Sequence, residues 1–479
     1  MPGLPDLIEA TGAKILQRGV FTFSGLSTDS RTINKDELFI ALSGPNFDGH
    51  DFLAAALTAG AGAIISRPLK AGFSLDKSKS ILLVDDTLAA LQKIARYIRM
   101  KRPDMPVAGV TGSNGKTTTK ELAALVLGRR FKVLKSSGNF NNQIGLPLNL
   151  CRLDDRHGAA VLEMGASRPG DIAELCAIAR PTHGIITNVS ESHLEGFTTF
   201  KALMETKLAL ASAAGAFVYN ADDPRLSNAV QSEFGGGKNK KVKSKIGFGM
   251  NEGAELRAED IRMEGGASTF RLSGRGQSAV LRFSSAGLFN VYNALAAAAC
   301  GLLFDISLSE AASALTEFSG VPMRYGITQA AGALILGDVY NANPASMDAA
   351  LLELQRLRGK RAVAVLGDML ELGDYSEEAH RGLGRRLASL PVDIFIAVGP
   401  MMNLAREEFL ISKGGPAPKN KNKNKNAFSC ADSAQAGSLL MENLRAGDTV
   451  LIKGSRGVQM ERVLEYVSGA DGTSVPGKR

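Results

Sequence analysis

Short apolar runs alternate with longer segments of helical periodicity along nearly the whole chain. Apolar runs at residues 106–112, 159–165 and 183–189 have the length and the glycine or polar boundaries of buried strands. Segments between and after them, such as residues 171–180 and 200–214, repeat apolar positions at the spacing of one helix face. Strands that alternate with helices in this way predict an α/β fold with mainly parallel sheets.

The pattern divides into three blocks, and 479 residues are too many for one hydrophobic core. Residues 1–104 predict a small α/β domain that ends in the linker-like segment KRPDMP. Residues 105–326 predict a central domain with a doubly wound sheet, whose site lies in the loops at the carboxyl ends of the strands. The pattern restarts in residues 327–479, which predicts a second α/β unit similar to a nucleotide-binding domain.

The net charge of +8 changes this picture little, because it is concentrated in two lysine-rich stretches near residues 240 and 420. Their ten lysines exceed the whole net charge, so the rest of the chain is close to neutral. Alternating lysine and asparagine cannot bury apolar surface, which predicts two solvated loop insertions; the alternative is a loop that binds a polyanion. No aromatic residues interleave with the lysines, so we expect no nucleic-acid partner.

The cysteines and the apolar runs favour a cytoplasmic protein. Cys151, Cys176, Cys300 and Cys430 have neither metal-site spacing nor the pattern of a disulfide framework. The N-terminus carries acidic residues where a signal peptide would be basic and then apolar. The apolar run at residues 293–304 is shorter than the roughly 18 residues that a membrane span needs. We therefore expect reduced thiols and no membrane insertion.

The segment VAGVTGSNGKTTTKELAALVL, residues 107–127, places a glycine-rich turn between a predicted strand and a predicted helix. Such a turn lets backbone N–H groups approach phosphate, with the lysine on the β and γ phosphates and the next hydroxyl on Mg²⁺. The match to the phosphate-loop pattern is imperfect, because Val110 stands at the first glycine position. The alternative is a plain glycine turn with a solvated lysine. The predicted ATP-binding residues here are Gly112, Ser113, Asn114, Gly115, Lys116, Thr117 and Thr118.

Polar residues follow two further predicted strands, Glu163 after one and Asn188 with His193 after the next. Carboxyl ends of neighbouring parallel strands meet along one crevice, so Glu163 and His193 could hold a second Mg²⁺ opposite Thr117. Taken singly, Glu163 could instead be a helix-capping carboxylate and His193 a surface-loop histidine. Lys207, on the predicted helix at residues 200–214, would be a solvated lysine from pattern alone.

Taken together, several motifs resemble those of the Mur ligases of peptidoglycan synthesis, in the family's order and over nearly the whole chain. They are TGSNGKTTTKE, GNFNNQIGLPLNL, LEMGASRPGDI, TNVSESHLEGF, NADDP, FNVYNALAAA, GDVYNANPASM, LGDMLELGDYSEEAH and LIKGSRGVQME. Within the family, YNANPASM and LGDMLELG favour the member that adds D-alanyl-D-alanine to a UDP-linked tripeptide. The DNPR motif of diaminopimelate-adding relatives has no counterpart.

The resemblance implies three domains, which bind a UDP-sugar peptide, ATP and the incoming amine in that order. It implies that ATP phosphorylates the terminal carboxylate of UDP-N-acetylmuramoyl-tripeptide. The amine of D-Ala-D-Ala then attacks the acyl phosphate, giving the pentapeptide, ADP and phosphate. Two Mg²⁺ ions and a monomer are expected.

The resemblance also implies roles for individual residues. Lys116 clamps the phosphoryl group, Thr117 holds one Mg²⁺, Glu163 and His193 hold the other, and Lys207 matches a lysine that relatives carry as a carbamate. Further nucleotide contacts implied are Asn290 and Asn293 at adenine, Arg324 at the phosphates, and Asp338, Tyr340 and Asn341 near ribose. Implied substrate contacts are Ser30, Arg31, Asp48 and His50 for UDP, Asn139 and Asn142 for the acyl phosphate, and Lys453, Ser455 and Arg456 for the dipeptide.

Some positions leave other interpretations open. The segment KGSRG could be only a glycine turn before a helix. Phe289 stands where relatives often have histidine, so the contact with adenine is expected to differ. On the same scaffold, a sister ligase could add a single amino acid to another acceptor. A nucleotide-binding switch could use the phosphate loop without forming a bond, although the third α/β unit argues against it.

Overall fold

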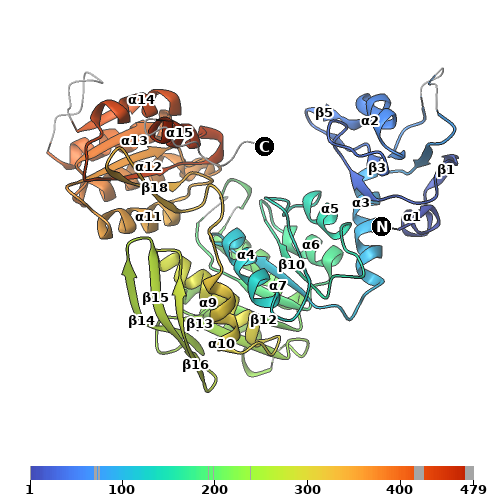
Figure 1. The fold of residues 1–479 in the computed structure, drawn as a ribbon, viewed down its shortest axis with the longest axis horizontal. Coiled ribbons are helices and arrows are strands. Elements are labelled where there is room, and N and C mark those ends of the chain that lie inside the picture. The colour runs from blue at the N-terminus through green and yellow to red at the C-terminus, as the bar shows by residue number, and fades with distance from the viewer. Residues whose placement is uncertain are drawn as a thin grey trace.

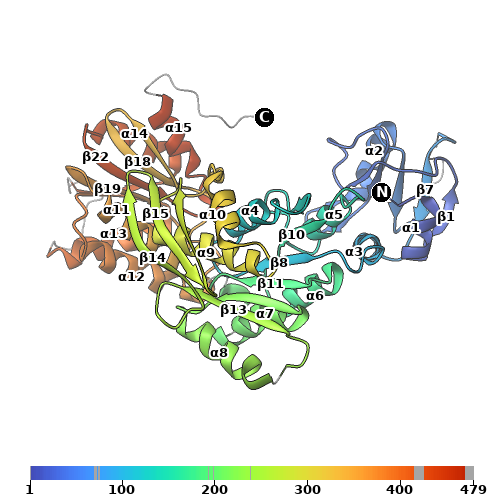
Figure 2. The same cartoon turned by 60° about the horizontal axis from the view of Figure 1, so that its bottom comes forward.

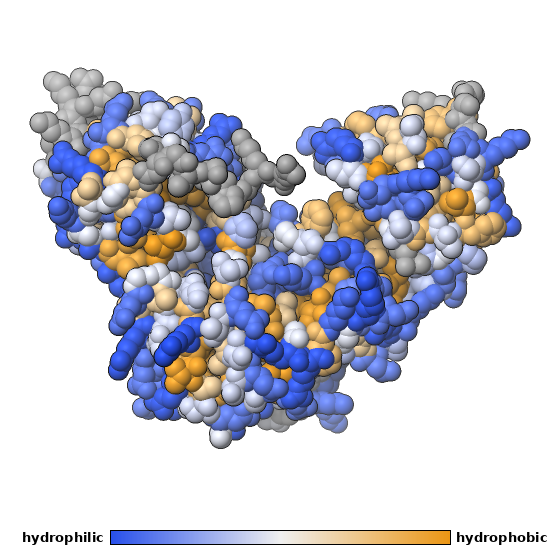
Figure 3. Space-filling model, in the orientation of Figure 1, coloured by the Kyte–Doolittle hydropathy of each residue, from blue (hydrophilic) through white to orange (hydrophobic). Residues whose placement is uncertain are grey.

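The computed structural model describes residues 2–69, 73, 76–191, 194–197, 199–237, 239–414 and 426–469. Three mixed, largely parallel sheets follow one another along the chain, which confirms the predicted α/β class. We call the units built on them the N-terminal, central and C-terminal domains. Figure 1 shows the N-terminal and C-terminal domains on opposite sides above the central domain, and Figure 3 shows open space between them.

The N-terminal sheet has the strand order β1-β7-β6-β3-β2, in which only β1 is antiparallel to its neighbour. Its strands are β1 Lys14–Gln17, β2 Gly25–Ser27, β3 Glu37–Ile40, β6 Gly62–Ile65 and β7 Ser80–Leu83. The helices α1 Leu4–Thr11 and α2 Leu53–Ala59 accompany it, and a small hairpin, β4 Ser43–Gly44 and β5 Phe47–Asp48, leads into the short helix η1 Gly49–Phe52.

Helix α3, Thr87–Met100, joins the N-terminal domain to the central one. Asp86 caps its first turn, and Tyr97 donates a hydrogen bond to Asp6 of α1. Its other face packs against the central helices α5 and α6. Arg99, which is 1% exposed, donates to the carbonyl oxygens of Ala179 and Arg180. The helix is therefore packed between two domains and not confined to the first.

The central sheet has the order β16-β15-β14-β13-β12-β11-β8-β10-β9. Its parallel strands are β8 Val107–Thr111, β9 Val133–Lys135, β10 Ala159–Glu163, β11 His183–Ile186, β12 Ala216–Asn220 and β13 Ser244–Gly249. Strands β14 Leu256–Glu264, β15 Ala267–Gly274 and β16 Gln277–Phe283 extend it, and β15 is antiparallel to both of its neighbours.

Helices cover both faces of the central sheet, as a doubly wound fold requires. On one face lie α4 Lys116–Leu127, α9 Leu288–Leu302 and α10 Leu308–Thr316; on the other lie α5 Gly145–Leu150, α6 Asp171–Ala179, α7 Phe200–Ala213 and α8 Pro224–Phe234. Successive strand residues serve opposite faces: Ala160 and Leu162 pack with α6 and α7, whereas Val161 packs with α4 and α9. This two-sided burial is why the strands are continuous apolar runs.

The C-terminal sheet has the order β17-β18-β22-β19-β20-β21, parallel except for the edge strand β17. Its strands are β17 Gly326–Ala330, β18 Ala333–Asp338, β19 Arg361–Gly367, β20 Ile394–Val398, β21 Ala427–Cys430 and β22 Asp448–Lys453. Helices α11 Pro344–Arg356, α12 Ser376–Ala388 and α13 Pro400–Ser412 cover one face, and α14 Ser433–Asn443 and α15 Glu461–Gly469 the other.

The β14–β15 hairpin reaches the C-terminal domain, as both ribbon views show (Figure 1, Figure 2). A Cβ atom built at Gly266, in its turn, would lie 3.8 Å from Ile327 of β17. The sequence pattern predicts no strands at residues 256–283, so this extension of the central sheet is seen only in the structure.

The first lysine-rich stretch is only partly a loop, because β13 already begins at Ser244 and includes Lys245. Most of the second stretch, residues 415–425, lies outside the described residues. Within the described part of the chain, no helix is both long and apolar enough to cross a membrane.

Candidate active site

A cavity of about 940 Å³ opens between the central and C-terminal domains. Its central wall is formed by the loops after β8, β10, β11 and β12, where the parallel strands end. Its C-terminal wall is formed by the loops after β18, β19 and β22. Ligands of open α/β sheets bind at such carboxyl ends, so the topology gathers the predicted residues in the expected place.

The turn between β8 and α4 requires glycine at two positions. Gly112 has φ +149° and Gly115, which precedes α4, has φ +80°. A Cβ at Gly112 would lie 1.9 Å from Thr187 Oγ1, and one at Gly115 would lie 2.3 Å from Asn293 Oδ1. Only glycine combines these backbone angles with so close an approach of neighbouring side chains.

Lys116 folds back over this turn, with Nζ donating to the carbonyl oxygens of Gly112 at 2.9 Å and Ser113 at 3.1 Å. Loss of solvation lowers its pKa; the charges of Glu163 and Glu371 oppose that shift, and the charge of Arg324 adds to it. The ammonium group is therefore poorly solvated, which makes an anionic phosphate a favourable partner.

Residues that follow β11 hold the phosphate loop from one side. Asn188 Oδ1 accepts from the Asn114 backbone N–H at 3.0 Å, and Thr187 Oγ1 donates to the Asn114 carbonyl at 2.6 Å. Ser113 Oγ accepts from the backbone N–H of Ser190 at 2.9 Å. The residues that follow β11 therefore fix the conformation of the phosphate loop.

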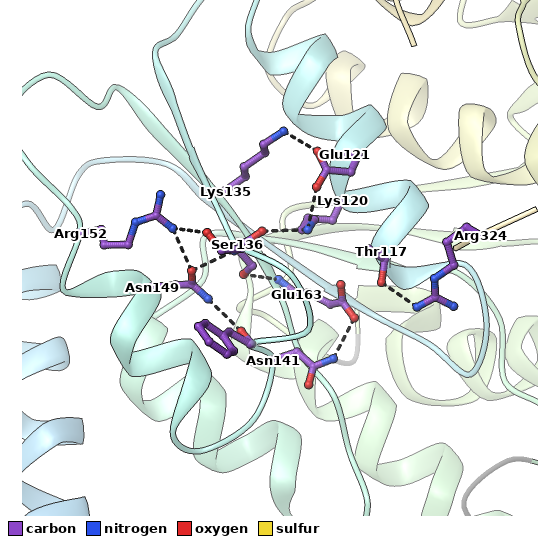
Figure 4. A network of polar contacts seen from close by, with 12 residues as sticks. Thr117, Lys120, Glu121, Lys135, Ser136, Asn141, Asn149, Arg152, Glu163 and Arg324 are labelled. Atoms are coloured by element: carbon purple, nitrogen blue, oxygen red, sulfur yellow. Dashed lines mark hydrogen bonds and ion pairs between the residues drawn. The ribbon is translucent and has the colours of Figure 1, made fainter. Parts of the chain in front are cut away.

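Two contacts join the loop to chain segments that follow the central sheet. Arg324 donates to Thr117 Oγ1 at 3.1 Å (Figure 4). The Arg324 guanidinium also lies 3.9 Å from the centre of the Tyr340 ring. Asn343, which caps α11 through Ser346, donates from Nδ2 to Asn114 Oδ1 at 2.8 Å. The nucleotide loop and the C-terminal domain are therefore in direct contact.

Glu163, at the end of β10, is 2% exposed and lines the cavity. Its Oε1 accepts from Asn141 Nδ2 at 2.8 Å, whereas its buried Oε2 has no hydrogen-bond partner among the described residues (Figure 4). Its backbone N–H donates to Ser136 Oγ, and the Ser136 carbonyl accepts from the buried Lys120 at 2.8 Å. This support fixes one carboxylate oxygen and leaves the other available for a cation.

The remaining predicted residues of the metal region are Lys207 and His193. Lys207, on α7, is 1% exposed, and its pKa is well below its usual value, mainly because of burial and then because of the charge of Lys116. His193 lies outside the described residues. Among the described residues, no group of three or more His, Cys, Asp or Glu forms a ready cation site.

The predicted asparagines form two sets along the cavity wall. Asn290 and Asn293 of α9 are mostly buried: Asn290 bonds to Ser285, and Asn293 Oδ1 accepts from Thr119 of α4. Asn139 and Asn142 lie on the opposite side, where Asn142 Oδ1 accepts from the N–H groups of Ile144 and Gly145. Phe289 also lines the cavity and meets Tyr325 edge to face.

On the C-terminal wall, Lys453 is 1% exposed and pairs with Asp338, and also donates to the Asn341 carbonyl at 2.9 Å. The pair fixes the loop that carries Tyr340 and Asn341. Ser455 Oγ accepts from the Leu370 N–H at 2.9 Å, and Arg456 donates to Glu461 at 2.6 Å. These residues line the same cavity as Lys116.

The predicted UDP contacts lie on the N-terminal domain and do not line this cavity. Asp48 Oδ1 lies 2.7 Å from His50 Nδ1, and hydrogen bonds from His50 lower the pKa of Asp48. Arg31 pairs with Asp29 at 2.6 Å, and Ser30 is partly exposed beside it.

Among the cavity residues that the sequence does not predict are Asn141, Asn343 and Glu371. All three stand inside motifs that were recognised, GNFNNQIG, YNANP and LGDMLELG. Their spacing in the sequence does not distinguish these asparagines and this glutamate from neighbouring residues that have no role in the cavity.

Family models match three consecutive parts of the chain. Residues 22–99 match the Mur ligase family catalytic domain, residues 110–301 the Mur ligase middle domain, and residues 323–456 the Mur ligase glutamate ligase domain.

Curated relatives and solved structures agree with these matches. The UDP-N-acetylmuramoyl-tripeptide--D-alanyl-D-alanine ligase of Bacillus subtilis is 34% identical over 447 residues, 92% of each chain. The Escherichia coli ligase of the same name is 33% identical over 94% of each chain. A crystal structure of MurF from Acinetobacter baumannii has TM-score 0.85 and 30% identity, covering 98% of this chain and 99% of that one. MurF from Thermotoga maritima in complex with ADP has TM-score 0.78 and 30% identity, covering 93% and 97%.

Proposed function

The chain belongs to the Mur ligase family, and from that premise we propose that it joins D-alanyl-D-alanine to UDP-N-acetylmuramoyl-tripeptide at the expense of ATP. It is a ligase of peptidoglycan precursor synthesis. The observation that carries this function is a single cavity lined by the phosphate loop, by Glu163 and by the C-terminal loop of Ser455 and Arg456. Such a cavity brings phosphoryl transfer and amide formation to one place.

In the first step, the terminal carboxylate of the tripeptide attacks the γ-phosphorus of ATP, and ADP leaves. The N–H groups at the start of α4 and the Lys116 ammonium oppose the charge that spreads over the transferring phosphoryl group. Arg324 adds a second cation beside Thr117. The carboxylate becomes an acyl phosphate, whose phosphate is a far better leaving group.

The residues present fit the expected Mg²⁺ ions, because Glu163 directs an unpartnered buried oxygen at the cavity. Thr117 would hold one ion, and Glu163 with His193 the other. The ions would neutralise part of the negative charge of the phosphate groups. Asn141 contributes by fixing Glu163 Oε1, so that Oε2 keeps its direction.

Lys207 would carry a carbamate. Carbon dioxide reacts only with an uncharged amine, and burial favours that form of Lys207 at neutral pH. The product is an anion, and the positive charge of Lys116, which acts on Lys207, favours an anion at this position.

The other contacts follow the family's order of domains, with boundaries at residues 1–104, 105–326 and 327–479. Asn290 and Asn293 would meet adenine, Asp338, Tyr340 and Asn341 the ribose side, and Asn139 and Asn142 the acyl phosphate. Ser30, Arg31, Asp48 and His50 would hold the UDP group, and Lys453, Ser455 and Arg456 the dipeptide. We place the enzyme in the cytoplasm, in keeping with four unpaired, buried cysteines. We also propose that it acts as a monomer.

Phosphate release tests the function. Purified protein with ATP and Mg²⁺ should release phosphate only when both UDP-N-acetylmuramoyl-tripeptide and D-Ala-D-Ala are present, with a pentapeptide product by mass. Release with a single amino acid in place of the dipeptide would indicate a sister ligase. Release without either acceptor or amine would contradict ligation.

A further inference from the structure

The hydrogen-bond ladder between β9 and β10 ends in an irregular way at Glu163. Lys135 pairs with Val161 as the last residue of β9, and the N–H of Ser136 still donates to the Val161 carbonyl at 3.1 Å. In a regular parallel ladder, the next bond would run from the Glu163 N–H to the Ser136 carbonyl. Instead, that N–H donates to the Ser136 hydroxyl oxygen at 3.0 Å (Figure 4). The Ser136 side chain therefore takes the place of its own carbonyl at the end of the ladder.

The Ser136 carbonyl, turned away from the ladder, accepts a hydrogen bond from helix α4. Lys120 of this helix is 1% exposed, and its Nζ donates to the Ser136 carbonyl oxygen at 2.8 Å. The same ammonium group pairs with Glu121 at 2.8 Å. A buried ammonium group is costly unless such partners replace the lost water, so these contacts account for its position. A charge-assisted hydrogen bond thereby joins α4 to the end of β9.

Helix α4 also carries the phosphate loop at its N-terminus. Its first residues, Lys116 and Thr117, line the cavity, and Lys120 lies one turn further along on the same face as Lys116. Two consecutive hydrogen bonds, from Lys120 to Ser136 and from Glu163 to Ser136, therefore connect this helix to the carboxylate expected to hold Mg²⁺ (Figure 4). The connection runs behind the cavity, because neither Lys120 nor Ser136 lines it.

The loop that Ser136 begins also reaches the side chain of Glu163. Asn141 Nδ2 donates to Glu163 Oε1 at 2.8 Å, and the Asn141 carbonyl accepts from the Gly165 N–H at 2.8 Å. A Cβ built at Gly165 would lie 2.9 Å from Asn141 Oδ1, so the loop lies directly against the strand end. Ser136 thus holds the main chain of Glu163, and Asn141 holds one of its carboxylate oxygens.

We propose that Lys120 and Ser136 are positioning residues for the Mg²⁺ ion that Glu163 is expected to hold. Lys120 fixes the main chain of Ser136 from α4, and the Ser136 hydroxyl fixes the main chain of Glu163. Together they set Glu163 relative to Thr117, the expected ligand of the other ion. The proposal rests on the proposed ligase function and adds to it two residues that act through Glu163.

Variants of the three lysine and serine positions test this connection. Ser136→Ala removes the hydroxyl and leaves the carbonyl for Lys120. Lys120→Met keeps the apolar stem and removes the ammonium group, and a double variant combines both changes. Lys135→Met is the matched control, because the Lys135 ammonium also pairs with Glu121, but from a side chain that is 52% exposed.

The primary measurement is Mn²⁺ binding to the ADP complex, followed by the electron paramagnetic resonance signal of the free ion. The difference between the wild type and Glu163→Gln defines the ion held by Glu163. Loss of a group that orients a metal ligand weakens metal binding by about ten- to a hundredfold, so Ser136→Ala and Lys120→Met should each weaken binding of this ion on the order of tenfold. Lys135→Met should match the wild type. The double variant should lose little more than either single variant, because both residues act through one connection.

Two further measurements separate positioning from a merely structural role. ADP affinity without divalent metal, measured by calorimetry, should match the wild type in both single variants, because the phosphate loop itself is unchanged. Ligation should fall at limiting Mg²⁺ and recover with excess Mg²⁺, which a loss of folded protein would not do.

Wild-type Mn²⁺ affinity in Ser136→Ala or Lys120→Met would overturn the proposal, even if denaturant unfolding showed lower stability. An equal loss in Lys135→Met, or losses that multiply in the double variant, would also overturn it, as would a wild type that binds Mn²⁺ no better than Glu163→Gln. Failure of the wild type to ligate would instead overturn the proposed function, and the Mn²⁺ titration would still decide the role of the two residues.

Discussion

The side-chain amides of Asn114 and Asn343 exchange hydrogen bonds although 229 residues separate them in the chain. Asn343 Nδ2 lies 2.8 Å from Asn114 Oδ1, and Asn114 Nδ2 lies 3.4 Å from Asn343 Oδ1. The Oδ1 of Asn343 also caps α11 by accepting from the Ser346 N–H at 2.9 Å. One carboxamide therefore begins a helix of the C-terminal domain and holds that helix against the phosphate loop.

Substitution of Asn343 can separate these two tasks. Serine is as good a helix cap as asparagine but is too short to reach Asn114, so Asn343→Ser should fold with near wild-type stability. Loss of about 1 kcal/mol of hydrogen bonding between domains should lower kcat/KM about fivefold. Asn343→Ala should in addition lose about 1 kcal/mol of unfolding free energy with the cap. Steady-state kinetics and denaturant unfolding of both variants test these expectations. Equal stabilities of the two variants would contradict the capping role of Asn343. Wild-type kinetics of both variants would contradict a role for the hydrogen bond between Asn343 and Asn114.

Gly115→Ala should abolish tight nucleotide binding. The left-handed backbone costs alanine about 1 kcal/mol, and its Cβ would also lie 2.3 Å from Asn293 Oδ1. Gly138→Ala is the matched control, because Gly138 also has a positive φ of 50° but has open space around its Cβ position. Calorimetric titration with ADP should show lost affinity for the first variant alone. Similar ADP affinities of the two variants would show that the clash between the added Cβ and Asn293 does not cause the loss of binding.

Activity should depend on dissolved carbon dioxide through Lys207. The lowered pKa of this buried amine provides the uncharged form that carbamate formation needs. Turnover should fall in carbon dioxide-free buffer and return with bicarbonate, and ¹³C-labelled bicarbonate should give a carbamate signal in NMR spectra. Lys201→Ala is a control on the same helix, at a side chain that is 85% exposed, and should keep both the turnover and the signal. A signal that persists in Lys207→Ala would assign the carbamate to another lysine.

His183 should make stability depend on pH below neutrality. Its ring contacts Phe304 with ring centres 4.1 Å apart and the ring planes tilted by 34°, and burial lowers its pKa from 6.5 to about 4. The unfolded chain therefore binds a proton at a pH where the folded chain does not, so stability falls as the pH drops from 6.5 through about 4. The shift corresponds to at most about 3 kcal/mol. Urea unfolding of the wild type and His183→Gln at both ends of this range measures it; parallel pH curves for the two proteins would contradict the prediction.

Much of the central domain could be predicted because its strands are buried on both faces and are followed by helices with clear periodicity. The run at residues 159–165 became β10, with Glu163 at its end, as the pattern indicated. The antiparallel strands β14 to β16 are not predicted because they are partly exposed: in β14 only Leu256 and Ala258 are buried, and from Asp260 onward exposed residues alternate with partly buried ones. An alternating polar strand gives a much weaker signal than an apolar run.

The site residues are predicted from motifs, and a motif does not show which of several adjacent polar residues makes a given contact. In GNFNNQIG, Asn139 and Asn142 were selected, yet Asn141 is the residue that holds Glu163. Lys453 was expected to face the dipeptide, and its ammonium is engaged with Asp338 and the Asn341 carbonyl. Such pairings depend on which loops the fold brings together, and they have no local pattern in the chain.

The position of α3 bears on how the chain could be divided. The predicted boundary after residue 104 follows a turn in the sequence, but the helix before it covers α5 and α6 and satisfies the carbonyl groups of Ala179 and Arg180. A fragment that begins at residue 105 would expose that apolar surface and leave these acceptors unpaired, which favours aggregation. A fragment that begins at Asp86 would keep both the helix and its cap. A fragment that contains the central domain should therefore begin at the start of α3, inside the segment that the sequence assigns to the N-terminal domain.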